Sequence, residues 1–136
     1  MRSLVIVSVI AISLFACRST VPTTRSGVEF MTDASAYAPG DSVRLQLVNH
    51  EDQEIGYNLC FSDLAREDEA GWVVVPDTMT VCTTELRLLA PGDTATYVKT
   101  LMLGVEPGTY RYQTGIEFQA DGQREEVGTN SFRIEE

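Results

Sequence analysis

The sequence predicts an all-β protein, an antiparallel β-sandwich of seven to eight short strands with Greek-key connections. Three observations predict it. Short stretches of alternating apolar and polar residues recur along the chain, and Pro-Gly turn phrases precede several of them. No segment shows an apolar stripe at the helical period of 3.6 residues. The clearest alternation runs from residue 110 to residue 118, directly after the pair Pro107-Gly108.

The first of these turn phrases, APGDS at residues 38–42, returns as APGDT at residues 90–94. Proline presets the second position of a tight turn, and glycine takes the positive φ of the third position in a type II turn. We therefore expect Gly40 and Gly92 to be turn residues, with Gly108 of the third Pro-Gly pair in a similar role. Each turn leads into a predicted strand, at residues 43–47, 95–101 and 110–118. The other predicted strands are residues 28–32, 54–61, 72–75, 84–89 and 127–134.

The chain begins with an apolar run at residues 4–15, preceded by the single charge of Arg2. This run is shorter than the ~20 residues of a membrane-spanning helix and has the length of a secretory signal. It ends in Leu14-Phe15-Ala16-Cys17, which resembles the lipobox of bacterial lipoproteins. The resemblance implies that residues 1–16 are removed and that lipid on Cys17 anchors the protein to the membrane of the cell envelope. Ordinary cleavage after an alanine is the alternative.

The segment that follows, residues 17–26, is small, polar and proline-containing, so we expect a flexible tether. The folded domain is then residues 27–136. By the sorting rules of the lipoprotein family, Arg18 in place of an aspartate implies the outer membrane if the host is Gram-negative.

Three cysteines are an odd number for an exported protein. If Cys17 carries lipid, Cys60 and Cys82 remain as a pair in an oxidising compartment, and we expect a disulfide between them. A metal site is the alternative use of these thiols, but it would need further soft ligands. The chain has one histidine, His50, and no CxxC motif, so we expect neither a metal nor a cofactor.

The order of the motifs resembles bacterial immunoglobulin-like domains over nearly all of residues 27–136. The matching motifs are Tyr-x-Pro-Gly-Asp at 37–41, a strand with Cys60, Trp-Val-Val-Val-Pro at 72–76, Leu-x-Pro-Gly-Asp at 89–93 and Pro-Gly-x-Tyr-Arg at 107–111. The resemblance implies an immunoglobulin-like sandwich in which the strands after the two APGD turns are neighbours in one sheet. It also places Tyr110 like the tyrosine-corner residue of such folds. Position 112, where antibody-type domains have a disulfide cysteine, is a tyrosine here.

Composition excludes some functions. The formal net charge is −10, from 20 acidic and 10 basic residues, which argues against nucleic-acid binding. No nucleophile motif accompanies the single histidine, so we do not expect an enzyme or catalytic residues.

Two classes of function remain. The first is a non-catalytic envelope lipoprotein that binds a protein or a glycan or has a structural role. Trp72 would then be either a platform for a sugar ring or a residue that packs in the core or against the disulfide. The second is a protease inhibitor that presents residues 62–71 as a rigid, extended loop, with Leu64 and Arg66 as anchors.

Overall fold

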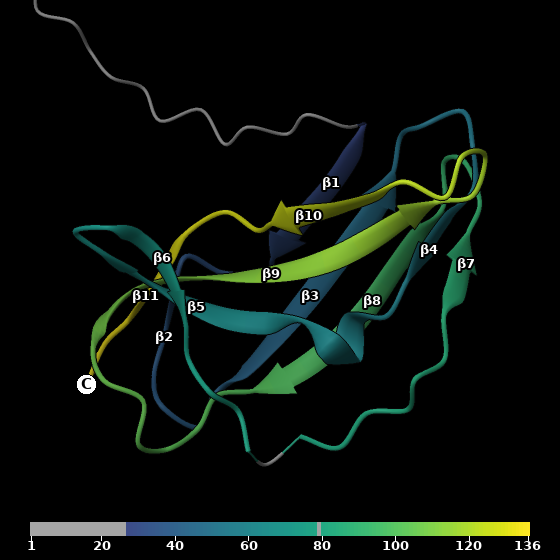
Figure 1. Ribbon diagram of the computed structural model, residues 1–136. Coiled ribbons are helices and arrows are strands. Elements are labelled where there is room, and N and C mark those ends of the chain that lie inside the picture. Colours follow the sequence, from purple (N-terminus) through teal and green to yellow (C-terminus); the bar gives the residue numbers. More distant parts are fainter. Residues whose placement is uncertain (1–26, 79) are drawn as a thin grey trace, which may run out of the picture.

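The computed structural model describes residues 27–78 and 80–136, which fold as a β-sandwich (Figure 1). The predicted signal peptide, Cys17 and the tether lie outside these residues. No helix in the described ranges is long and apolar enough to cross a membrane. The elements are β1 (Val28–Thr32), β2 (Ala36–Tyr37), β3 (Ser42–Asn49), β4 (Ile55–Tyr57), the 3-10 helix η1 (Leu59–Phe61), β5 (Asp63–Asp68), β6 (Gly71–Val74), β7 (Arg87–Leu89), β8 (Thr94–Thr100), β9 (Gly108–Phe118), β10 (Arg124–Gly128) and β11 (Phe132–Ile134).

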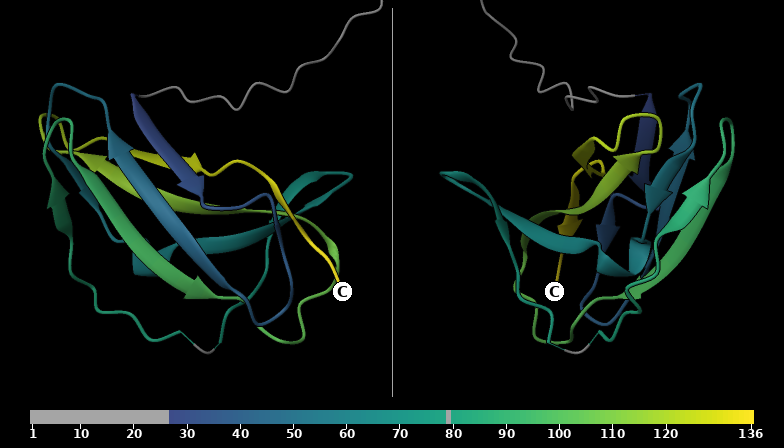
Figure 2. Two further views of the ribbon diagram at one scale, coloured as in Figure 1. Left: turned by 180° about the vertical axis from the view of Figure 1, so that it is seen from behind. Right: turned by 45° about the vertical axis from the view of Figure 1, so that its right-hand side comes forward.

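Two sheets face each other (Figure 2). The smaller sheet has the order β1-β3-β8, and the larger has the order β2-β11-β9-β4-β7. The long strand β9 also pairs with β10 and β5, and β5 pairs with β6. The chain crosses from the smaller sheet to the larger at β2 and returns at β3, crosses again at β4 and returns at β8, and crosses once more at β9. All pairs are antiparallel except that of β2 with β11, so the predicted immunoglobulin-like antiparallel sandwich is confirmed.

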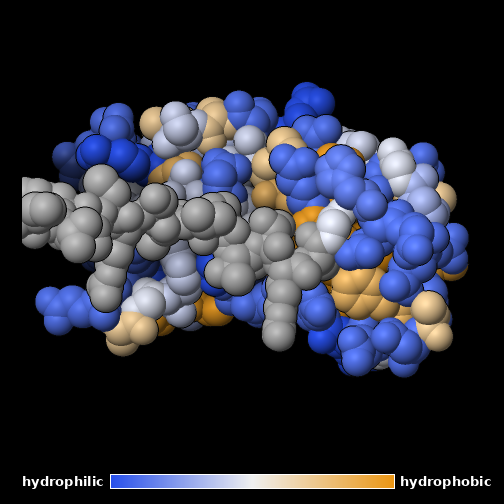
Figure 3. Space-filling model, turned by 90° about the horizontal axis from the view of Figure 1, so that it is seen from above, coloured by the Kyte–Doolittle hydropathy of each residue, from blue (hydrophilic) through white to orange (hydrophobic). Residues whose placement is uncertain are grey.

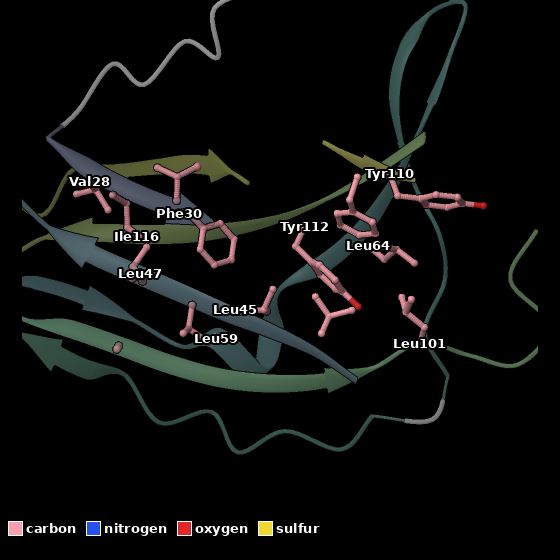
Figure 4. Close-up of a cluster of buried hydrophobic side chains, with 14 of the residues drawn as sticks. Val28, Phe30, Leu45, Leu47, Leu59, Leu64, Leu101, Tyr110, Tyr112 and Ile116 are labelled. Carbon is pink, nitrogen blue, oxygen red and sulfur yellow. The ribbon is translucent and has the colours of Figure 1, made fainter. Parts of the chain in front are cut away.

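The core lies between the sheets and is made by the alternating residues that predicted the strands (Figure 4). In β3 the side chains of Val43, Leu45 and Leu47 are fully buried, and the residues between them are not. In β9 every second residue from 110 to 118 is buried. Because successive side chains of a strand point to opposite faces, this pattern leaves each sheet one face for the core and one for other contacts.

Both APGD turns have the predicted conformation. Asp41 N donates to Ala38 O over 3.1 Å with Gly40 at φ +87°, and Asp93 N donates to Ala90 O over 3.1 Å with Gly92 at φ +80°. The strands that follow these turns, β3 and β8, pair from Ser42↔Thr100 to Val48↔Thr94. The two turns therefore have the same conformation and the same position, each just before one of two neighbouring strands, as the resemblance implied.

Tyr110 forms the expected tyrosine corner. Its hydroxyl donates to Glu106 O over 2.6 Å, four residues upstream, while its ring is buried against Phe132 at 6.5 Å between centroids. Burial raises the pKa of the Tyr110 hydroxyl. The bond holds the connection before β9 against the core.

Gly108 is not a turn residue, contrary to the prediction. It is the first residue of β9 and does not have positive φ. A Cβ at this position would lie 3.1 Å from the Arg66 Nε, so the glycine permits the close approach of that side chain. Glycine is needed at position 108 because a larger side chain would collide with Arg66, and not because the backbone has an unusual φ.

The part of the chain that the structure describes has eleven strands, above the seven to eight expected, because β2 and β5 were not predicted and residues 127–134 are divided between two strands. A second predicted run, residues 54–61, is also divided but adds no strand. Residues 54–61 form β4 and then η1, because the Asn58 side chain accepts from Cys60 N over 3.1 Å and starts a helical turn. Residues 127–134 contribute to β10 and β11, with a break at Thr129, whose Oγ1 accepts from Tyr112 N over 3.0 Å. Side chains that bond to the main chain thus interrupt both runs.

Candidate binding surfaces

A segment held by the disulfide borders two grooves on the molecule. Residues 80–86, here called the disulfide segment, belong to the connection between β6 and β7 and are exposed except for Cys82. The predicted disulfide Cys60–Cys82 is present, with 5.7 Å between the Cα atoms. The Asn58 Nδ2 donates to the carbonyl oxygens of Thr83 and Glu85, each over 2.8 Å. These bonds fix an otherwise irregular stretch of chain against η1.

The first groove, here called the outer-face groove, has a volume of about 400 Å³. Gly56 of β4 and Gly115 of β9 belong to its lining, and Phe61 and Leu86 stand beside them with 51% and 49% of their areas exposed. A Cβ at Gly56 would lie 2.8 Å from the Leu86 Cδ2, so this glycine lets Leu86 lie close to the sheet. Gly115 is exposed between two buried neighbours, so it belongs to the face turned away from the core.

One ion pair belongs to the lining of the outer-face groove. The Arg124 Nε donates to the Glu117 carboxylate over 2.9 Å, across the pairing of β10 with β9. The groove thus combines apolar side chains with this ion pair and with a further acidic residue, Glu85. In the view of Figure 3, hydrophilic residues cover most of the visible surface and hydrophobic ones form small patches between them.

The second groove, here called the edge groove, lies along β8 beside the disulfide segment. It consists of two hollows. One, of about 250 Å³, includes Val81, Thr83, Thr96 and Tyr97 in its lining. The other, of about 590 Å³, runs along residues 97–103. Tyr97 belongs to both hollows, so they are neighbours along the same strand edge.

Residues 62–71 are not an extended loop, which corrects the prediction for the inhibitor hypothesis. They form most of the β5–β6 hairpin, and β5 pairs with β6 on one side and β9 on the other. Leu64 is 7% exposed and belongs to the core. Arg66 bonds within the molecule, to Glu106 over 2.7 Å and to Pro107 O over 3.2 Å. Neither side chain is presented as an anchor.

Trp72 lies on β6 and is half-buried, outside the core cluster. The Arg111 guanidinium lies 4.5 Å from the centre of its ring. A Cβ at Gly128 would lie 3.2 Å from the same guanidinium, so Arg111 is held between Trp72 and β10. Burial lowers the pKa of Arg111. The indole therefore packs on Arg111 and not in the core, and Arg111 covers one face of the ring.

Within residues 27–78 and 80–136, the histidine and acidic side chains form no candidate metal site. His50 lies 3.1 Å from the Glu29 carboxylate at the surface. No group of three histidine, cysteine or acidic side chains there could hold a metal ion.

Comparisons with known proteins give the fold alone. No protein-family model matches the chain, and no curated protein does. The structural-genomics target SoR45 is similar at 16% identity and a TM-score of 0.50, over 80% of this chain and 82% of that one. A neutral ceramidase from Pseudomonas aeruginosa has 18% identity and a TM-score of 0.47, over 82% of this chain but 19% of the ceramidase. A PapD-like domain of human CEP192 has 17% identity and a TM-score of 0.42, over 95% and 99% of the two chains.

Sequence reasoning missed both grooves. Each is assembled from segments distant in the chain, such as residues 56, 86 and 115 in the outer-face groove. One local signal was available: Gly115 stands at an outward position in the alternation of β9, where a side chain would otherwise cover the sheet.

Proposed function

We propose that this protein is a non-catalytic lipoprotein of the cell envelope whose immunoglobulin-like domain binds another protein. The outer-face groove is the observation that carries the proposal. Phe61 and Leu86 expose about half of their areas there, beside two glycines. Burying such side chains against a partner gains ~25 cal/mol per Å² of apolar area, and aromatic residues dominate many protein interfaces.

A protein fits these surfaces better than a glycan does. Sugar binding at Trp72 uses an open indole face, and Arg111 already covers one of the two faces of that ring. The outer-face groove offers aliphatic and aromatic contacts, with Glu117 already paired to Arg124. Apolar side chains around a groove suit the anchor residues of a protein partner.

Two features support the envelope location. The Cys60–Cys82 disulfide is typical of an oxidising compartment. The lipobox-like sequence before Cys17 supports a lipid anchor, with the outer membrane as the destination in a Gram-negative host. We expect Cys17→Ser to release the protein from washed membranes. Wild-type protein cut after Ala16 without added lipid mass would contradict this part of the proposal.

Site-specific photo-crosslinking in the host tests the binding function. A benzophenone amino acid at Leu86 should give a discrete protein adduct, and Phe61→Ser should remove that adduct. The matched control is the same probe at Arg44, which is exposed on β3 of the opposite sheet. Equal adducts at both positions, or none at Leu86, would contradict binding at the outer-face groove.

The disulfide segment supports protease inhibition as a second candidate, in place of the hairpin at residues 62–71. Val81 is 95% exposed and is adjacent to the disulfide, which limits the entropy that the segment would lose in an enzyme cleft. A panel of serine, cysteine and metallo-proteases separates the two candidates. Absence of inhibition at micromolar protein would leave the binding module.

A further inference from the structure

Strand β8 is the last strand of the smaller sheet, and one of its sides is open. β3 pairs with the other side over its whole length, in unbroken register. No strand pairs with the open side anywhere in residues 27–78 and 80–136. Figure 2 shows β8 beside β3, on the side away from β1.

The ends of the β3–β8 ladder show which main-chain groups face the open side. Asn49 N donates to Asp93 O over 3.0 Å, and Leu101 N donates to Asp41 O over 2.9 Å. Residues 93 and 101 therefore face β3, and so do residues 95, 97 and 99, because an antiparallel ladder alternates. The N–H and C=O groups of residues 94, 96, 98 and 100 point to the open side. Within the described ranges no hydrogen bond satisfies them.

This edge has few of the features that usually prevent strand pairing. Natural edge strands carry prolines, exposed charges, bulges or inward-pointing charges. Residues 94–100, TATYVKT, contain no proline, glycine or acidic residue, although the chain has 20 acidic residues. The one such feature is Lys99, an inward-pointing charge that is 8% exposed and pairs in register with the buried Val43. Threonine, valine and tyrosine favour strands, so the edge is well suited to an additional strand.

The edge groove can take the side chains of such a strand. With its side chains alternating between the two faces of the sheet, a strand added to β8 would lie against the hollows of about 250 and 590 Å³. Their lining includes apolar residues that are partly or largely exposed: Tyr97 at 37%, Val98 at 53% and Leu103 at 85%. These linings favour apolar residues at alternate positions of the added strand.

We propose that the edge groove binds an extended, proline-free segment of a partner protein as an additional strand on β8. Apolar residues of the segment occupy alternate positions, and lysine or arginine residues flank them. Main-chain hydrogen bonds to residues 94, 96, 98 and 100 supply affinity, and the two hollows supply specificity. The basic flanks follow from the net charge of −10, which attracts a cationic segment and repels a second copy of this chain.

The edge groove is a different surface from the outer-face groove, so this proposal does not depend on partner binding at the outer-face groove. The test uses a phage-displayed library of random ten-residue peptides, selected on the detergent-extracted full chain. We expect enriched peptides to alternate apolar and polar residues without proline and to carry basic ends. Their binding should weaken as salt rises, because the flanks act through charge.

Two substitutions of Val98 separate the contribution of its main-chain N–H to peptide binding from that of its side chain. Val98→Pro removes an N–H that points away from β3, so the ladder with β3 remains intact, and proline is tolerated on such edges. Val98→Thr keeps the N–H and has a similar shape. We expect the enriched peptides to bind Val98→Pro at least tenfold more weakly, and to bind Val98→Thr and Leu86→Ser within about twofold of the wild type.

A second measurement covers the case in which Val98→Pro fails to fold. Amide hydrogen exchange of Thr96 and Val98 in the wild-type chain should slow when an enriched peptide is added. Failure to enrich peptides, equal binding to folded Val98→Pro, or unchanged exchange at these amides would overturn the proposal. So would loss of binding on Leu86→Ser alone, or direct crosslinking of Tyr97→Cys chains to each other through residue 97.

Discussion

Replacement of the two turn glycines by alanine tests how the repeated APGD phrase works. Gly40 and Gly92 have φ of +87° and +80°, a region that disfavours any residue with a Cβ. Their surroundings differ, however. A Cβ at Gly92 would have nothing within 4 Å, whereas a Cβ at Gly40 would lie 2.8 Å from the Leu103 Cδ2. Gly92→Ala therefore measures backbone strain alone, and Gly40→Ala measures strain plus a contact.

The magnitudes follow from these two contributions. A non-glycine residue in the left-handed region costs about 1–2 kcal/mol, which is the expected loss of unfolding free energy for Gly92→Ala. Gly40→Ala should lose about 0.5–1 kcal/mol more, because Leu103 must leave its preferred rotamer. That addition is small since Leu103 is 85% exposed and can move into solvent. In the double variant Gly40→Ala/Leu103→Ala the addition should disappear.

Urea unfolding followed by the fluorescence of Trp72, the only tryptophan, provides the assay. Gly104→Ala is the matched control, because Gly104 does not have positive φ and a Cβ there would meet nothing within 4 Å. It should change stability by less than about 0.5 kcal/mol. Equal stability of Gly92→Ala and Gly104→Ala would refute the argument that positive φ explains the repeated phrase.

Three further outcomes are expected. Replacing Cys60 and Cys82 together by serine should lower the unfolding free energy by about 2–4 kcal/mol in urea titrations, for a sequence separation of 22 residues. Tyr110→Phe removes the bond to Glu106 O and should cost about 0.5–1.5 kcal/mol in the same assay, without loss of ring packing. Burial raises the pKa of Tyr110 and Tyr112, so their neutral forms stabilise the fold fully below pH ~10, and this contribution is lost as pH rises further. The urea midpoint should fall as pH rises above about 10, and Tyr112→Phe should reduce that fall.

Local chemistry predicted much of this fold. Alternation predicted β3 and β9 because one face of each strand is buried, and turn chemistry predicted Gly40 and Gly92 because few residues other than glycine adopt their φ. The tyrosine corner of Tyr110 came from the resemblance to immunoglobulin-like domains. These features depend on residues within a few positions of one another.

The β5–β6 hairpin shows why other parts could not be predicted. Residues 63–68, DLARED, are mostly polar and offer no period-two pattern, since Leu64 and Ala65 are adjacent and both are buried. The stretch is a strand because β9 and β6 satisfy its main chain on both sides. This tertiary pairing overrides the local propensity. The same reason explains the errors at Leu64 and Arg66, whose partners lie elsewhere in the chain.

The candidate surfaces depend on a few bonds that also stabilise the fold. The Asn58 side chain starts η1 through its Oδ1 and holds the carbonyl oxygens of Thr83 and Glu85 through its Nδ2. The disulfide fixes Cys82 to η1 in the same region. Thr84 and Leu86 contribute to the outer-face groove, and Val81 and Thr83 contribute to the edge groove, so one anchored segment supplies part of each. Replacing Cys60 and Cys82 by serine should therefore weaken binding at both grooves, because it frees the segment that they share. We expect this weakening even under conditions in which the variant remains fully folded.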